Sequence, residues 1–465
     1  MEHQLISEQL ARFSVWTRFE EFPEEVIRLG IHHIYDSIGC GILGAISKDS
    51  AQFESALGLC GSLNGIAPLW GKGTYCTPQS AAWANGLACH AFEMDDTNGC
   101  DHSGAVVLPA ALAAVSIANS EISGKEFITA VILGYEFARR ALESLGSYEE
   151  HNQAGWNSTG TCGPFGAAVA AGRILGLNVE QTQWSLGLAA SFSSGLWSFI
   201  HDNSKSKKLH PGNAARGGLM AAVLASQGFT GPKRIFEDEW GSFGNTFAPK
   251  TKNNVAWLDK LGENWKICRS SIKPYPSNRS THSSIEAVVE LVAQHNINPD
   301  DIDKVIVRAN PFVMEMCGLA RIDPMSAAQS SIPFNVAACL INPDFGMKAF
   351  CRKERLNVRL RELMQKVEMV EDNTQKAVEE PIVTIRLLNG EEFTLRVETP
   401  SGGIEKPLSQ EKLDAKFYEM VEFVYDKPTA RELRDMILSL ASLPSVTPLT
   451  ELLARTPARK YQEDF

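Results

Sequence analysis

The sequence predicts a mainly α-helical protein with a smaller α+β part, and three observations carry this prediction. Apolar residues recur at helical spacing through residues 1–265, with Ala and Gly abundant between 79–230. Apolar and polar residues alternate over 381–398, which is the pattern of β-strands. Helical spacing returns over 408–456. We therefore expect helices at 1–265, an α+β part at 266–403, and further helices after it.

Local patterns justify the elements of the first part in order. Residues 4–60 predict helices, one of which starts at Pro23, because a proline and two acids suit a first helical turn. Residues 61–78 are rich in Gly, Pro and Thr and predict a loop or a short hairpin. The run GTCGPFGAAVAAGRILGL at 160–177 places small residues at three- and four-residue steps, so that helices can approach closely. The charge of Arg173 favours a buried helix over a membrane span.

The later part of the chain carries strand and hairpin signals. Val305-Ile306-Val307 is a β-branched run. Asn389-Gly390 separates two alternating runs, which is the strongest short-range signal for a hairpin. Three helices are expected near the C-terminal end, over residues 413–423, 431–443 and 449–454.

Composition narrows the class of partner. A chain of 465 residues, with 44% hydrophobic and 21% charged residues, is ordinary for a globular protein of two or three domains. A net charge of -11 argues against nucleic acid or an anionic membrane, so an anionic substrate would need a local basic pocket. The ten Cys form no CxxC pair, which predicts neither a disulfide framework nor a zinc site. Without a signal-peptide pattern or a long apolar run, the expected location is cytoplasmic.

Residues 91–110, AFEMDDTNGCDHSGAVVLPA, place a polar cluster between two apolar, Ala-rich runs. Asp95, Asp96, Thr97 and His102 are costly to bury unless they are paired or used. Two interpretations stay open from these residues alone: a set of helix caps, or catalytic groups on a loop held by rigid helices. The acids and the His could also hold a divalent ion, but their spacing does not require one, and we expect no metal.

Two further clusters supply cations. Residues 204–213 contain Lys207 and Lys208 just before an expected helix start, where unpaired N–H groups favour an anion; a solvated loop is the alternative. Residues 273–282, KPYPSNRSTH, offer a phenol, a guanidinium and an imidazole, which suit carboxylate binding and proton transfer. The alternative there is an interdomain turn capped by Thr281.

Some polar residues are weaker candidates. Asn157 and Gln329 lie near expected helix starts, where plain capping explains both. His33 lies inside an expected helix and is interpreted as structural. His90 could be structural or functional.

Five ordered motifs make the chain similar to the MmgE/PrpD family, whose members include 2-methylcitrate dehydratase, cis-aconitate decarboxylase and iminodisuccinate epimerase. The motifs extend over nearly the whole chain: MDDTNGCDHSGAVVLPAA, NSTGTCGPFGAAVAAGRILGL, SKKLHPGNAARGG, KPYPSNRSTHSSIEA and AQSSIPFNVAA. The resemblance implies a large all-α domain built from residues 1–265 and 404–465, and an α+β lid from 266–403. It also implies a homodimer, no metal, no organic cofactor, and an active site in the crevice between the domains.

The resemblance also carries over site residues by motif. The implied active site contains Asp95, Asp96, His102, Lys207, Tyr275, Arg279 and His282. We expect His102 to be the principal acid–base, oriented by Asp95 or Asp96. Lys207 and Arg279 would stabilise developing negative charge, and Tyr275 would donate a second proton. Residues expected to bind the substrate are Lys208, Arg279, His282, Thr97, Asn157 and Gln329.

These parts fit a cofactor-independent lyase acting on a small di- or tricarboxylate. The family's commonest activity favours dehydration of a citrate or 2-alkylcitrate. Decarboxylation of a cis-aconitate-type substrate and epimerisation of a carbon acid such as iminodisuccinate stay open, as does a non-catalytic carboxylate-binding or scaffold role. Two departures from the family bear on the choice: Asn157 stands where cis-aconitate decarboxylase and many dehydratase-like relatives have His, and Phe334 stands where relatives often have Tyr.

Overall fold

The computed structural model describes three stretches of the chain: residues 4–202, 204–376 and 379–458. Their residues form two compact units. The first unit contains the described residues up to Ala91, those of Asp95–Ile272, and those from Met420 onward. The second contains Phe92–Met94 and the described residues of Lys273–Glu419. The later boundaries between the two units thus fall at residues 272/273 and 419/420. The sequence predicted them at 265/266 and 403/404.

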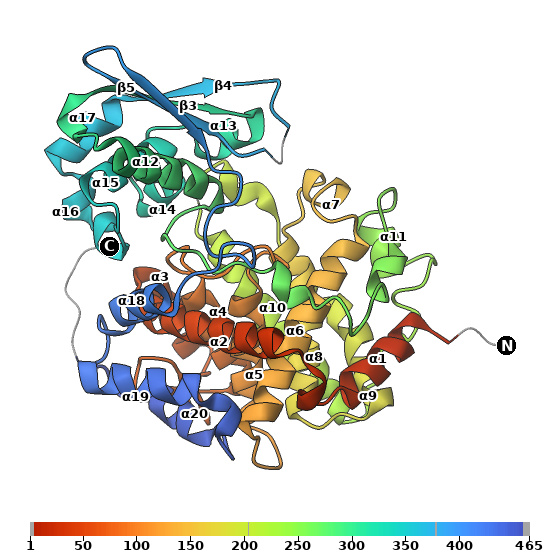
Figure 1. Cartoon of the computed structure of the whole chain (residues 1–465). Helices are drawn as coiled ribbons and strands as arrows, with labels where there is room; N and C mark the ends of the chain where they lie inside the picture. The colour runs from red at the N-terminus through yellow and green to blue at the C-terminus, as the bar shows by residue number, and fades with distance from the viewer. Residues whose placement is uncertain (1–3, 203, 377–378, 459–465) are drawn as a thin grey trace. The chain divides into compact units, whose positions relative to one another are not determined.

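The first unit is a bundle of α-helices with one short hairpin (Figure 1). Its longer helices are α1 (Ile6–Trp16), α2 (Glu24–Gly44), α3 (Lys48–Leu59), α4 (Pro78–Cys89), α5 (Ser103–Val115), α6 (Gly124–Ser144), α8 (Ser158–Ile174), α9 (Val179–Ala189), α10 (Ser206–Ser226) and α19 (Lys427–Leu438). Shorter helices are α7 (Glu150–Gln153), α11 (Phe243–Phe247) and α20 (Thr447–Leu453). The hairpin pairs β1 (Ala67–Leu69) with β2 (Thr74–Cys76). The mainly α prediction is confirmed.

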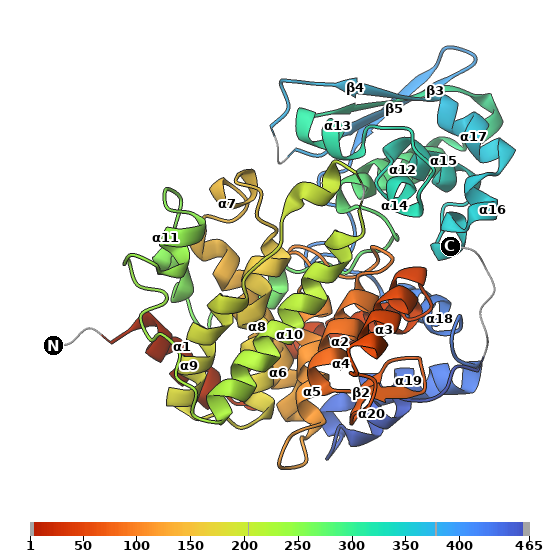
Figure 2. The ribbon, with the colours of Figure 1, turned by 180° about the vertical axis from the view of Figure 1, so that it is seen from behind.

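Small residues let the central helices of this unit approach closely, as expected. Figure 2 shows α4, α5, α6, α8 and α10 side by side, and these helices contact one another. A Cβ on Gly166 of α8 would lie 2.4 Å from the carbonyl oxygen of Gly134 on α6. A Cβ on Gly86 of α4 would lie 2.6 Å from the Cα of Gly212 on α10. Larger residues at these crossings would push the helices apart. These helices carry the polar loop within residues 91–110 and the lysine cluster within residues 204–213.

The second unit is built around a four-stranded sheet of order β4-β3-β5-β6. Its strands are β3 (Ile302–Ala309), β4 (Val367–Glu371), β5 (Ile382–Leu387) and β6 (Glu392–Arg396). The β3–β4 pair is parallel, and the β3–β5 and β5–β6 pairs are antiparallel. The turn between β5 and β6 contains Gly390 with a φ of 89°, so the predicted Asn389-Gly390 hairpin is confirmed.

Helices cover the apolar face of this sheet. The unit's helices are α12 (His282–His295), α13 (Pro311–Cys317), α14 (Met325–Gln329), α15 (Ile332–Ile341), α16 (Arg352–Arg355), α17 (Val358–Gln365) and α18 (Gln410–Val421), the last of which ends in the first unit. Inward residues of β3 and β5, such as Val305 and Ile385, form one core with α12 and α15. The paired hydroxyls of Thr384 and Thr394 are exposed. The alternating strands therefore bury one face.

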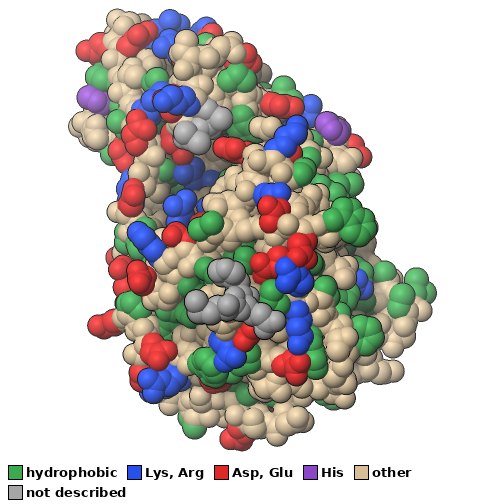
Figure 3. Space-filling view, turned by 90° about the vertical axis from the view of Figure 1, so that its right-hand side faces the viewer, with side chains coloured by type: hydrophobic (Ala, Val, Ile, Leu, Met, Phe, Trp, Pro, Cys, Tyr) green, Lys and Arg blue, Asp and Glu red, His purple; other side chains and the backbone are tan. Residues whose placement is uncertain are grey.

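Charged side chains of both signs are interspersed over the face of the molecule in Figure 3. The net charge of -11 is therefore not gathered there into a single acidic field. Among the residues that the structure describes, no helix combines the length and the apolar character that a bilayer crossing needs.

Candidate active site

The polar loop between α4 and α5 has an unusual backbone. Glu93, Asn98 and Asp101 have φ angles of 55°, 66° and 75°, in the left-handed region that residues with side chains rarely adopt. Arg139 of α6 holds the loop by donating to the carbonyls of Asn98 and Gly99, at 3.3 and 3.1 Å. Such backbone strain costs about 1–3 kcal/mol per residue, persists only where the surroundings impose it, and is frequent at active sites.

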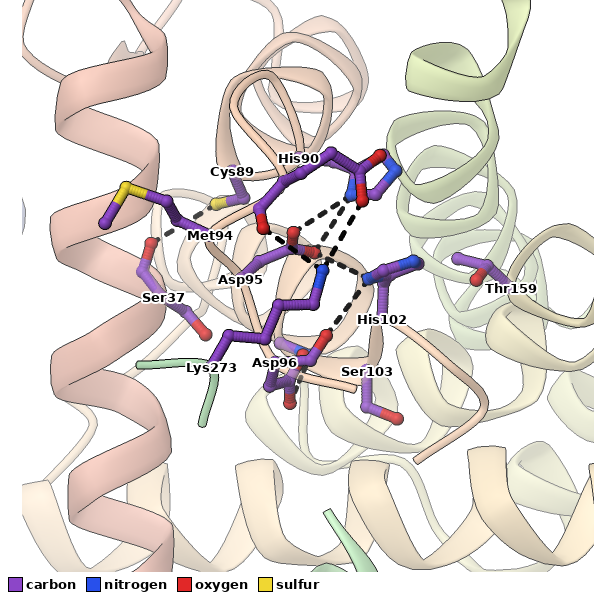
Figure 4. A network of polar contacts seen from close by, with 12 residues as sticks. Ser37, Cys89, His90, Met94, Asp95, Asp96, His102, Ser103, Thr159 and Lys273 are labelled. Atoms are coloured by element: carbon purple, nitrogen blue, oxygen red, sulfur yellow. Dashed lines mark hydrogen bonds and ion pairs between the residues drawn. The ribbon is translucent and has the colours of Figure 1, made fainter. Parts of the chain in front are cut away.

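In this loop, Asp95 contacts the imidazole rings of both His90 and His102 (Figure 4). Its buried carboxylate has one oxygen 3.0 Å from Nδ1 of His90 and the other 3.0 Å from Nδ1 of His102. The ring centroids are 4.0 Å apart. Burial alone would raise the pKa of Asp95, but the charge that both imidazoles can carry outweighs it and holds this pKa well below its usual range. Asp95 is therefore an anion that can stabilise a protonated imidazole.

The hydrogen bonds of His102 fix its tautomer. Its Nδ1 lies 3.0 Å from the backbone carbonyl of Asp96 and 3.0 Å from the carboxylate of Asp95. A carbonyl oxygen only accepts, so Nδ1 carries a proton and donates it. The other ring nitrogen, Nε2, is then the atom that can accept a proton. An imidazole backed by a buried carboxylate in this way is suited to general acid–base catalysis.

The carboxylate of Asp96 has a different role, because it faces the start of α5. It accepts from the backbone N–H of Gly104 at 3.0 Å and from the hydroxyl of Tyr135 at 2.7 Å. Negative charge at a helix N-terminus is favourable. Burial first, and then the charge of Asp96, raises the pKa of Tyr135 well above its usual value, so this hydroxyl stays a donor. Asp96 contacts His102 through its backbone carbonyl, so Asp95 supplies the carboxylate that orients the imidazole.

The lysine cluster forms the first turn of α10. Within it, Lys208 is already paired, since its Nζ lies 2.5 Å from a carboxylate oxygen of Asp49 on α3. Lys205 lies 2.6 Å from the same carboxylate. The charge of Lys208 is thus offset locally, which weakens the case for it as a substrate ligand, although this role stays a prediction.

Lys207 lies one helical turn before the imidazole of His210. Burial first, and then the charges of His90 and Lys207, lower the pKa of His210 to about 4, so this imidazole is neutral at pH 7. His210 is thus close enough to both groups for their charges to interact. His90 in turn contacts Asp95, and whether Lys207 faces the same site stays a prediction.

Thr97 and Asn157 both engage the backbone of the first unit. Thr97 exchanges two backbone hydrogen bonds with Ser271, at 2.9 and 2.8 Å. The side chain of Asn157 caps α8 by accepting from the N–H of Gly160 at 3.3 Å. Its own N–H donates to the carbonyl of Gly195 at 3.0 Å. Capping therefore accounts for Asn157, and contact of either residue with a substrate stays a prediction.

The second unit brings Tyr275 and His282 together. The ring of Tyr275 stacks on Phe345 with centroids 5.4 Å apart, and it meets His282 edge-on at 5.4 Å. Burial raises the pKa of Tyr275. Burial first, and then the charge of Arg279, lowers the pKa of His282 well below its usual value, so the imidazole is neutral. The role of Tyr275 as a proton donor and that of His282 in binding the substrate stay predictions.

Arg279 and Gln329 are engaged within the second unit. The guanidinium of Arg279 lies 2.8 Å from the carboxylate of Glu380, an ion pair that occupies part of its donor fork. The amide Nε2 of Gln329 donates to the carbonyls of Phe92 and Pro276, at 2.6 and 3.0 Å. The motifs did not indicate either set of contacts. Binding of a substrate by Arg279 or Gln329 stays a prediction.

Sequence reasoning left His90 open between a structural and a functional role, interpreted His33 as structural and did not single out Tyr135, and the structure places all three beside Asp95 or Asp96. His90 contacts Asp95, which follows it by five residues in the chain. A His at the end of an expected helix, just before two acids, is the sequence signal that could have indicated this contact. Tyr135 reaches Asp96 from α6, and Nδ1 of His33 on α2 lies 3.2 Å from the same carboxylate. Neither sits near the acids in the sequence, so no local pattern pointed to them.

His90, Asp95 and His102 are also a set of described residues whose ligand atoms lie close enough together to hold a metal, within 4.8 Å of one another. Nδ1 of each imidazole lies 3.0 Å from the Asp95 carboxylate, and Nδ1 of His102 also meets the carbonyl of Asp96, so these contacts hold the three side chains together without an ion. The hydrogen-bond network thus accounts for the cluster, and a metal-free site stays our prediction.

The fold and this loop define a class of protein. A family model described as the MmgE/PrpD N-terminal domain matches residues 8–255, and the MmgE/PrpD C-terminal domain matches residues 275–442. The chain belongs to the MmgE/PrpD family, which confirms the resemblance seen in the five motifs.

Relatives similar over almost the whole chain are named cis-aconitate decarboxylase. The protein of that name from Homo sapiens is 28% identical over 463 residues, which are 96% of this chain and 94% of the relative. The one from Aspergillus terreus (strain NIH 2624 / FGSC A1156) is 27% identical over 460 residues, 93% of each protein. The one from Mus musculus is 26% identical over 470 residues, 96% of this chain and 93% of the relative.

Proposed function

We propose that this protein is a lyase that dehydrates a citrate or 2-alkylcitrate, with His102 as the acid–base and without a metal or organic cofactor. The observation that carries the proposal is the buried Asp95 carboxylate 3.0 Å from Nδ1 of His102, with Asp96 fixing the same nitrogen as a donor. This arrangement leaves Nε2 as the proton-exchanging atom and provides a charge that stabilises the imidazolium.

In the proposed reaction, neutral His102 takes a proton from the carbon next to a substrate carboxylate. The C–H electron pair forms the new double bond as the C–O bond to the neighbouring hydroxyl breaks. The protonated His102 then gives its proton to the departing hydroxide, so that water leaves and the imidazole returns to its neutral form. The anion of Asp95 stabilises the protonated His102 in the transition state, where such fixed charges act most strongly.

The substrate class is supported by charge and by chemistry. In a protein of net charge -11, a carboxylate substrate requires a local positive charge, and we propose that Lys207 provides it. Several relatives are named for an activity on cis-aconitate, which is citrate that has lost water. A citrate-type substrate therefore fits both observations.

Decarboxylation of cis-aconitate is the second candidate, because the names of the relatives favour it. This reaction needs a donor that protonates the carbanion left by carbon dioxide. Asn157 occupies a position where cis-aconitate decarboxylase carries His, and here its side chain caps α8. An amide does not exchange protons near pH 7, so this substitution counts against decarboxylation and suggests a variant of substrate or chemistry within the family.

The test is to incubate the purified protein separately with citrate, 2-methylcitrate, cis-aconitate and iminodisuccinate in deuterated water, followed by proton NMR. We expect loss of water from a citrate, and the reverse hydration of the matching aconitate. Release of carbon dioxide from cis-aconitate would replace the proposal with decarboxylation. Deuterium uptake without net conversion of iminodisuccinate would point to epimerisation. Binding without turnover across the panel would point to a non-catalytic role.

A further inference from the structure

Three consecutive backbone carbonyls, those of Phe92–Met94, accept hydrogen bonds from three separate side chains of the second unit. Nε2 of Gln329 donates to the first carbonyl at 2.6 Å. Nζ of Lys273 donates to the second at 3.1 Å. Nζ of Lys416, on α18, donates to the third at 2.8 Å. We call Gln329, Lys273 and Lys416 the carbonyl clamp.

All three donors of the clamp are buried. The exposed fractions of Gln329, Lys273 and Lys416 are 0%, 2% and 7%. Burying a lysine ammonium is unfavourable unless it is compensated, and hydrogen bonds from a charged donor are stronger than neutral ones. The carboxylate of Glu93, 3.4 Å from Lys273, adds to that compensation. Two buried cations on one three-residue segment hold it more firmly than neutral donors or water would.

The amide of Gln329 has one orientation that fits its surroundings. Its Nε2 faces two carbonyl oxygens, those of Phe92 and Pro276, at 2.6 and 3.0 Å. Turning the amide over would set its oxygen against both carbonyls, with no hydrogen to share. The N–H groups of Gln329 are therefore committed to the backbone.

The clamped segment, Phe92–Met94, directly precedes Asp95 and Asp96 in the chain. Asp95 follows Met94 in the chain, and Glu93, in the middle of the segment, has a left-handed φ of 55°. Each residue has only two soft backbone angles, so fixing three successive carbonyls sets the direction in which the chain enters Asp95. We propose that the carbonyl clamp positions the carboxylate of Asp95 against Nδ1 of His102, an inference that rests on the proposed function.

The test compares Lys416→Met, which removes one clamp donor, with Lys412→Met as a control on an exposed lysine one turn earlier on α18. Lys416→Arg is the conservative variant that keeps a charged donor. Gln329→Met is a second clamp variant of similar side-chain length, for use if Lys416→Met does not fold. The readouts are amide hydrogen exchange in peptides covering residues 92–104, and kcat and KM on the substrate that the panel identifies.

We expect the Lys416→Met protein to exchange amides of 92–104 about tenfold faster, because the segment opens more often. A displaced catalytic group lowers kcat by ~10–100-fold, while KM stays within about threefold. Lys416→Arg recovers most of both effects, and Lys412→Met behaves as wild type. Unchanged exchange and unchanged kcat in a folded Lys416→Met protein overturn the inference. A raised KM with unchanged kcat also overturns it, because that result makes Lys416 a substrate ligand.

Failure of the proposed function is distinguishable from failure of the clamp. If wild-type protein turns over nothing in the panel, the proposed function fails, and the exchange measurement still decides the clamp. Faster exchange over residues 92–104 in Lys416→Met, and not in Lys412→Met, then supports the clamp. Equal exchange in both variants and wild type overturns it.

Discussion

Replacing Asp95 with Asn keeps the shape of the side chain and removes its charge. Asp95 now meets two imidazole Nδ1 atoms, each at 3.0 Å, and an amide offers only one acceptor oxygen. His102 keeps the backbone carbonyl of Asp96 as a second acceptor, so the amide oxygen can serve His90. The fold should therefore survive Asp95→Asn with a loss of about 1–3 kcal/mol, the cost of poorly satisfied buried groups.

Catalysis should suffer more than stability. Removing the negative charge of Asp95 removes the group that stabilises the protonated imidazole of His102. An acid–base group contributes ~10²–10⁴-fold, so we expect kcat of Asp95→Asn to fall by at least ~10²-fold. KM should stay within about threefold, because the lost interaction acts in the transition state.

The same charge makes the protein sensitive to acid. The pKa of Asp95 in the folded state is well below its usual value, so its stabilising contribution is present above the usual carboxyl range. It is lost as the pH falls through the folded-state pKa. The Asp95→Asn protein should therefore show a smaller loss of unfolding free energy on acidification than wild type.

The assay combines turnover followed by NMR with urea unfolding at several pH values. Asp101→Asn is the matched control, because Asp101 lies in the same loop and an amide oxygen in its place still accepts from the hydroxyl of Ser158. We expect near wild-type turnover from this control. A folded Asp95→Asn protein with kcat within about threefold of wild type would refute the role assigned to Asp95.

Three other predictions follow from the first unit. Lys207→Met should raise KM by about tenfold or more, and Lys208→Met should raise KM less, because the ammonium of Lys208 is already paired with a carboxylate 2.5 Å away. His210 has a folded-state pKa of about 4 against 6.5 ordinarily, so the unfolded state binds the extra proton between these values. From pH 4 to 6.5, the unfolding free energy should thus rise ~3 kcal/mol more in wild type than in His210→Asn, and equal rises contradict this. Chelators should leave turnover unchanged, and a loss restored by a divalent metal would show that the cluster around Asp95 holds an ion.

Local patterns in the sequence account for much of the fold. The spacing of apolar residues finds the helices, because each amphipathic helix must bury one face whatever its partner is. The Asn389-Gly390 pair finds the β5–β6 hairpin, because few residues other than Gly and Asn tolerate its backbone. The 91–110 cluster stood out because buried polar groups require partners.

Partners that lie far apart in the chain could not be predicted in this way. The acid that pairs with Arg279 lies 101 residues later, and the one that pairs with Lys208 lies 159 residues earlier. Tyr135 lies 39 residues from Asp96, inside a helix whose pattern shows only that it is buried. Periodicity identifies the buried face of a helix, but the neighbour of that face is set by tertiary packing.

The most direct test of the central assignment is deuterium transfer from solvent to the substrate carbon, compared between wild type and His102→Gln. With the substrate and its dehydrated product at equilibrium in deuterated water, wild type should place deuterium at the carbon next to the carboxylate. The His102→Gln protein should do so ~10²–10⁴-fold more slowly while keeping its fold. Deuterium transfer at the wild-type rate in His102→Gln would show that another group moves the proton.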